Sequence, residues 1–211
     1  QLDDVKRLCA EYHAYKSAGD TAVVSHGVYV DGRIVAAFSW LPPPAGAAKA
    51  AAGKAAAGVL ALSRMIAIPR AERPRVKHIS KPLKIIMIRH IDRTRWPVLI
   101  TYSDESVGHT GYVYQCSGWT PKDRNKSAAY EDDKGARVSS YSNGACRAAN
   151  LTRVDDKWTT RWEHWITDSP LEWMLAHGWR RVPVPGKRWR SGAQAFTWVR
   201  DDPKQTHLFN L

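Results

Sequence analysis

The pattern of apolar and polar positions along the chain predicts a mixed α/β fold. An amphipathic segment over residues 3–16 predicts a helix, because Val5, Leu8 and Tyr12 fall on one face. Two runs rich in β-branched and aromatic residues, 22–30 and 34–40, flank an Asp-Gly pair, which is typical of a β-hairpin. The strand-like run 194–200 predicts a final strand.

The middle of the chain predicts a β-α-β unit. The apolar runs 59–68 and 98–103 predict two buried parallel strands. Between them, apolar residues at helical spacing predict a helix over 81–93, with Ser80 as its N-cap and a right-handed crossover. A short helix over 107–116 follows, ended by a glycine in the left-handed conformation.

The remaining elements predict one domain over residues 1–211. A hairpin is expected over 127–131 and 136–142, and a helix from Ser169 as N-cap to Gly178. The segment 45–57 contains nine alanines, so we expect an exposed, mobile connection there, which forms a helix if another element packs on it. The whole predicts an α/β sandwich around one mixed sheet with a central β-α-β unit. Residues 150–211 are expected to complete this fold.

Composition narrows the class of protein. Hydrophobic residues make up 44% and charged residues 25%, which is ordinary for a globular chain and excludes wholesale disorder. No apolar run approaches the ~20 residues that span a bilayer, and no signal-peptide pattern opens the sequence. We therefore expect a protein of the cytoplasm, without a membrane partner. Three cysteines without CxxC spacing indicate neither a disulfide framework nor a zinc site, so no metal ligands are assigned.

The charge indicates a polyanionic partner. The net charge is +12, and residues 64–95 contain ten Lys and Arg against only Glu72 and Asp92. Seven of the ten tryptophans lie between Trp158 and Trp198, interleaved with basic residues. This pattern favours nucleic acid first and a phosphate-bearing cofactor second. Each tryptophan has a plainer alternative in the protein core. The tail residues that we expect to contact nucleic acid are Arg180, Arg181, Lys187, Arg188, Trp189 and Arg190.

The predicted strand ends locate a candidate site. Ligands of open α/β sheets bind beyond the carboxyl ends of parallel strands, and a helix N-terminus attracts phosphate. Neither GxxxxGK[ST] nor GxGxxG is present, so evidence for a P-loop hydrolase or a Rossmann dehydrogenase is lacking. A phosphate-bearing cofactor is expected at the basic loop and helix start formed by Arg70, Arg73, Arg75, Lys77, Ser80 and Lys81.

The order of elements resembles the GNAT acyltransferase fold. The string VYQCSGW at 113–119 is similar to that family's tyrosine-bearing helix end, in which the tyrosine commonly protonates the CoA thiolate, and Tyr114 is the match. The resemblance implies acetyl-CoA or another CoA thioester as donor. The usual glycine-rich pyrophosphate turn is replaced by PRAERPRVKHIS.

A narrower resemblance is to the Mom-type phage DNA modification family, an offshoot of the GNAT fold. It rests on LSR at 62–64, TYSDESVGHTGYVYQCSGW at 101–119, and His13 within EYHAY. The family usually has His-Tyr adjacent, and Ala14 breaks that pair here. The resemblance implies transfer of a methylcarbamoyl-type group to the N6 amine of adenine in double-stranded DNA, as protection against restriction. The adenine must leave the base stack.

The adenine N6 lone pair is delocalised, so transfer needs a base, and we select Asp104. Its alternative role is to cap the helix that follows. Tyr114 is the expected proton donor to the leaving thiolate, with a side chain in the same cleft. Arg64 is expected to hold phosphate or orient Asp104, or else forms a strand-end salt bridge. His13 is a second base, a metal ligand or a structural residue. His109 is a further candidate base if Asp104 only caps.

Two other functions remain open on the sequence. One is an ordinary GNAT acetyltransferase acting on a small amine or a protein, which needs no duplex-sized basic surface. The other is a non-catalytic DNA-binding protein on the same fold. Because a methylcarbamoyl product does not arise by simple acetyl transfer, a metal or radical step involving iron is conceivable, although no metal triad is evident in the sequence.

Overall fold

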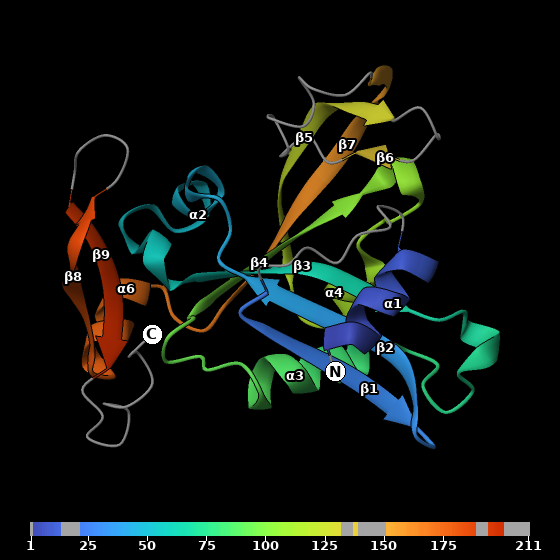
Figure 1. Ribbon diagram of the computed structural model, residues 1–211, viewed down its shortest axis with the longest axis horizontal. Helices are drawn as coiled ribbons and strands as arrows, with labels where there is room; N and C mark the ends of the chain where they lie inside the picture. The colour runs from blue at the N-terminus through green and yellow to red at the C-terminus, as the bar shows by residue number, and fades with distance from the viewer. Residues whose placement is uncertain (1, 14–21, 132–136, 139–150, 189–193, 201–211) are drawn as a thin grey trace.

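The computed structural model describes residues 2–13, 22–131, 137–138, 151–188 and 194–200 (Figure 1). Its main sheet has seven strands in the order β1-β2-β3-β4-β7-β5-β6, and β8 and β9 form a second sheet of two strands. The main-sheet strands are β1 (Val24–Val30), β2 (Arg33–Leu41), β3 (Val59–Ala67), β4 (Val98–Asp104), β5 (Thr120–Glu131), β6 (Arg137–Val138) and β7 (Thr152–Trp165). β3 and β4 are parallel and the other neighbours are antiparallel, which confirms the mixed α/β class.

The first hairpin follows the expectation from its turn residues. Asp31 and Gly32 both have positive φ, 50° and 77°, and join β1 to β2. Such a turn matches the twist of the strands that it connects. Residues 34–40 of β2 are all buried, so β2 lies inside the fold with packed layers on both faces.

The β-α-β unit is present, with one correction at the helix start. Helix α3 runs over Ser80–Arg89 and buries Leu83, Ile86 and Met87 against the sheet. Ile79 occupies the cap position and no side chain caps the helix. The prediction of Ser80 as N-cap is therefore wrong, because the helix includes Ser80 as its first residue.

The two parallel strands pair over a short distance and then diverge. Cα partners between β3 and β4 are Val59 with Val98, Leu60 with Leu99 and Ala61 with Ile100, all at the beginning of each strand. Beyond them, the Thr101 hydroxyl donates to the Leu62 carbonyl at 3.0 Å. The carboxyl-terminal halves of β3 and β4 are therefore not paired as strands, which leaves space between them.

Helices cover both faces of the sheet, as the sandwich prediction requires. Helix α1 (Leu2–Tyr12) buries Val5, Leu8 and Cys9 on one face. On this α1 face also lie α2 (Ala45–Ala52) and the 3-10 helix η1 (Gly53–Gly58). Ala48 and Ala55 are buried there, so the prediction of an exposed connection over 45–57 is wrong. Small alanine side chains permit this close packing. Helices α3 and α4 (Tyr112–Cys116) cover the opposite, α3 face.

The carboxyl-terminal part packs through its tryptophans. It comprises α6 (Pro170–Ala176), β8 (Trp179–Arg188) and β9 (Gln194–Arg200). The Trp173 indole donates to the Arg93 carbonyl at 3.1 Å, and the Trp179 indole to Thr94 Oγ1 at 3.2 Å. The Arg95 guanidinium lies 4.0, 5.3 and 5.9 Å from the ring centroids of Trp96, Trp179 and Trp198. These tryptophans thus have a structural use.

Two local predictions concern the second half of the chain. Ser169 precedes α6 as expected but makes no side-chain cap bond. Its backbone N–H donates to Thr167 Oγ1 at 3.2 Å. Tyr130 of β5 pairs with Val138 of β6, which confirms the predicted hairpin at that position. Its turn, 132–136, lies outside the described residues. None of the helices in the described ranges is long and apolar enough to cross a membrane.

Candidate active site

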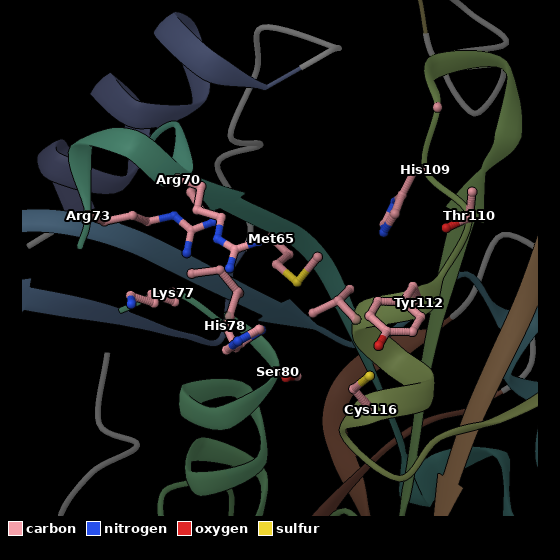
Figure 2. Close-up of a pocket in the computed structure, with 14 residues that line it drawn as sticks. Met65, Arg70, Arg73, Lys77, His78, Ser80, His109, Thr110, Tyr112 and Cys116 are labelled. Carbon is pink, nitrogen blue, oxygen red and sulfur yellow. The ribbon is translucent and has the colours of Figure 1, made fainter. Parts of the chain in front are cut away.

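A cavity of about 560 Å³ opens on the α3 face, where β3 and β4 have diverged (Figure 2). One wall comes from the end of β3, the loop that follows it and the start of α3. The other wall comes from the loop after β4 and from α4. The side chains that line it include Met65, Arg70, Arg73, Lys77, His78, Ser80, His109, Thr110, Tyr112 and Cys116.

The first wall carries the positive charge that the sequence predicted. Arg73 Nε donates to the Ile68 carbonyl at 2.8 Å, and its Nη1 donates to the Val76 carbonyl, so this side chain also fixes the loop. Burial lowers the pKa of Arg73, and the nearby charge of Arg70 lowers it further. The N-terminal end of α3 adds its positive dipole. This wall is suited to a phosphate-bearing group.

The structure divides the six predicted cofactor residues into two groups. Arg70, Arg73, Lys77 and Ser80 line the cavity. Arg75 lies outside it and forms an exposed ion pair with Asp31 at 2.6 Å. Lys81 is exposed on α3 and also lies outside the lining.

The second wall carries groups able to exchange protons. His109 lines the cavity, and its Nε2 is buried without a hydrogen-bond partner among the described residues. Burial lowers the pKa of His109, while the charge of Asp104 raises it by a smaller amount. The imidazole is therefore neutral at pH 7, with a nitrogen available to accept a proton.

Tyr112 and Cys116 stand beside each other on one side of α4, facing the same cavity (Figure 2). The side chain of Tyr112 is 69% exposed, and its pKa is raised mainly by a hydrogen bond with Cys116. A phenol in this position reaches solvent and the cavity together.

Two glycines give this wall its shape. Gly108 and Gly111 have φ of 74° and 79°, and they separate a short 3-10 turn, η3 (Glu105–Val107), from α4. A Cβ on Gly111 would lie 2.2 Å from the Trp162 ring of β7. The loop therefore rests directly on β7, and this contact holds His109 at the cavity.

Tyr114 lies away from the cavity. It is 2% exposed and packs among His109, Trp119 and Trp162 at centroid distances of 5.1–6.0 Å. Burial raises the pKa of Tyr114 to about 12, against a smaller opposing effect of a hydrogen bond with Thr101. Its position is that of a core residue that supports the loop.

Asp104 and Tyr114 do not share a cleft, contrary to the prediction. Side chains alternate along β4: Leu99 packs on the α3 face with Tyr114, whereas Val98 and Ile100 pack on the α1 face. Alternation places Asp104 on the α1 face too. Its Oδ1 accepts from the Ser106 N–H and hydroxyl, at 3.0 and 2.5 Å, and its Oδ2 pairs with Lys157 at 3.4 Å. The capping alternative for Asp104 is present, on η3.

Arg64 and His13 also belong to the α1 face. Arg64 lies opposite Ser39 in the β2–β3 ladder. Burial raises the pKa of the α1 thiol Cys9, and the charge of Arg64 opposes this by a smaller amount. His13 directly follows α1, and its N–H donates to the Cys9 carbonyl. Three of the four predicted catalytic residues thus share one face of the sheet, and Tyr114 stands alone on the other.

The predicted nucleic-acid residues of the tail lie on β8. Arg180, Arg181 and Arg188 are exposed, and the Arg181 guanidinium stacks 3.8 Å from the Phe196 centroid. The side chain of Lys187, and Trp189 and Arg190 entirely, lie outside the described residues. Figure 1 places β8 and β9 at the left end of the long axis, apart from α4.

The sequence analysis did not assign Tyr112 or Cys116 to the site, and it gave His109 only as an alternative base. The available signal was the pair of glycines in GHTG, which interrupts the predicted helix over 107–116. That interruption changes which tyrosine faces the cavity. Within the described ranges, no three His, Cys, Asp or Glu side chains come together as a metal site, and Cys9 and Cys116 are free thiols.

The protein thus has a mixed α/β fold with a cavity that carries cations on one wall and a histidine and a tyrosine on the other. The model of the Mom protein family matches residues 2–189. The chain therefore belongs to the Mom protein family, a family of phage DNA modification proteins whose substrate is DNA. No curated protein matches the chain.

Proposed function

We propose that this protein transfers an acyl group from a CoA thioester to the N6 amine of adenine in DNA. Membership of a DNA modification family supplies the substrate class. The observation that carries the reaction is the cavity itself, with cations on one wall and a neutral imidazole and a phenol on the other.

The cationic wall fits the donor. Arg70 and Lys77, with the start of α3, are placed to hold the phosphates of a CoA thioester. A bound thioester supplies an activated carbonyl carbon. The divergence of β3 and β4 leaves an opening through which the donor's reactive end is directed toward His109.

The opposite wall fits proton transfer. The imidazole of His109 accepts the N6 proton as adenine attacks the carbonyl carbon, and the Asp104 charge favours the imidazolium that results. The Tyr112 hydroxyl, exposed at the cavity, returns a proton to the departing sulfur. Asp104 thus acts through His109 as a positioning residue, and Tyr112 takes the role that the sequence assigned to Tyr114.

The test is mass spectrometry of nucleosides from DNA of cells that express the protein. We expect a heavier deoxyadenosine with the wild type, and its loss by about 10²- to 10⁴-fold in His109→Ala. The matched control is His90→Ala, which changes an exposed histidine outside the cavity lining. Unmodified adenine in well-expressing cells contradicts the proposal, and acetylation of a small amine or a protein would favour an ordinary acetyltransferase.

The donor site has its own test. Arg70→Glu and Lys77→Glu should each weaken binding of a CoA thioester by at least about tenfold, because each removes a charge-assisted contact. Arg75→Glu is the control from the same loop, since Arg75 is paired with Asp31 outside the cavity. Equal weakening by all three variants, measured by calorimetry, would show a general charge effect and contradict a donor site here.

A further inference from the structure

One tryptophan differs from the others that the structure describes. Several of the nine described tryptophans dock the tail or fill the core. Trp158 has the largest exposed fraction among the nine, 37%. It lies on β7 and belongs to none of the described core clusters.

Trp158 has cationic neighbours from β5. It lies directly opposite Lys126, whose ammonium is 5.9 Å from the ring centroid. The Arg124 guanidinium lies over the ring at 4.4 Å. Two further bonds fix Arg124, from its Nε and Nη2 to the Glu105 carboxylate at 2.9 and 2.7 Å. The arginine is therefore held in place beside the indole rather than free to swing away.

This pair lies on the same face of the sheet as the cavity. Trp158, Thr160 and Trp162 alternate along β7 and so share one face, and Trp162 packs on Gly111 beside His109. Two residues of strand advance about 7 Å, so Trp158 lies about 13 Å along β7 from Trp162. One or two nucleotides of an extended DNA strand would span this distance. Glu105, which holds Arg124, belongs to the same loop as His109.

We propose that Trp158 and Arg124 form a stacking platform for an unstacked nucleobase of the DNA, beside the modification cavity. This inference rests on DNA as the substrate in the proposed function. An indole stacks on any base, because every base has a π-face. Lys122, Arg124 and Lys126 are all exposed on β5 and complement the phosphate charge. Extruding an adenine requires such a surface, because the opened stack loses its own contacts.

The test is the affinity of the full chain for a short single-stranded oligodeoxyadenylate, measured by fluorescence anisotropy at fixed salt. Trp158→Ala should weaken binding by roughly 5- to 100-fold, the range of one lost base–aromatic stack. Trp158→Phe should restore most of it. A melting curve of each variant checks that it is folded at the assay temperature.

The tail supplies a matched control. Phe196 is another exposed aromatic covered by an arginine, Arg181, on the β8–β9 sheet. Phe196→Ala should leave binding unchanged. An abasic oligonucleotide of equal length should bind the wild type and Trp158→Ala alike, since it offers no base.

Three results would overturn the platform: unchanged binding in Trp158→Ala, an equal loss on the abasic strand, or the loss appearing in Phe196→Ala instead. Failure of the proposed chemistry looks different, because adenine would then stay unmodified while the Trp158-dependent binding of bases persists.

Discussion

Replacing Gly111 with alanine tests whether contact with β7 holds the cavity wall. Gly111 has φ of 79°, and a non-glycine residue in the left-handed region costs about 1–2 kcal/mol. The new Cβ would also lie 2.2 Å from the rigid Trp162 ring, and overpacking of this kind costs about 1–3 kcal/mol more. The total is about 2–5 kcal/mol.

Gly108→Ala separates the two contributions. Gly108 has φ of 74°, but a Cβ added there would meet nothing within 4 Å, so this variant carries the backbone cost alone. For a domain of this size, 1 kcal/mol lowers Tm by about 2–4 °C. We therefore expect Gly108→Ala to lower Tm by about 2–8 °C and Gly111→Ala by about 4–20 °C.

The assay is calorimetric melting of both variants beside the wild type, at one pH and salt concentration. Gly111→Ala should also lose adenine modification, because His109 sits two residues away on the displaced loop. If Gly111→Ala melts no lower than Gly108→Ala, the Trp162 contact does not hold this wall and the reasoning fails.

Two further predictions concern charge. Burial lowers the pKa of His109, and a base must be neutral to accept a proton. Activity should therefore be full at pH 7 and fall as the pH drops through a value below 6.5. If the residual activity of His109→Asn falls over the same pH range as that of the wild type, another group titrates. DNA affinity should fall with salt at a log–log slope of roughly −5 if about six phosphates are contacted, and a flat dependence in titrations from low to moderate salt would contradict an electrostatic interface.

The parts of the fold set by local signals were predictable from the sequence. The Asp31-Gly32 turn and the apolar run 98–103 each specify one structure by short-range rules, and both are observed. Strands β5 and β7 were harder, because segments such as TPKDRNK lack alternation of apolar and polar residues. They form strands because β4 offers β7 a long edge, which is a tertiary effect.

The candidate site was predictable in its charge but not in its geometry. Arg70, Arg73 and Lys77 follow a strand end, so their convergence on the cavity follows from topology. The choice between Tyr112 and Tyr114 depends on the orientation of a five-residue helix after two left-handed glycines, Gly108 and Gly111. The orientation of this helix cannot be obtained from residue spacing when the helix boundary is misplaced.

The short pairing of β3 with β4 gives the sheet a mechanical property. Three Cα pairs, ending at Ala61 and Ile100, join the half that carries Arg70 and Lys77 to the half that carries His109. A small rotation about this junction displaces the two walls in proportion to their distance from it, while the junction itself hardly moves. We therefore expect the separation of the two cavity walls to be the dimension that changes most readily between ligands of different thickness, with the three β3–β4 pairs kept.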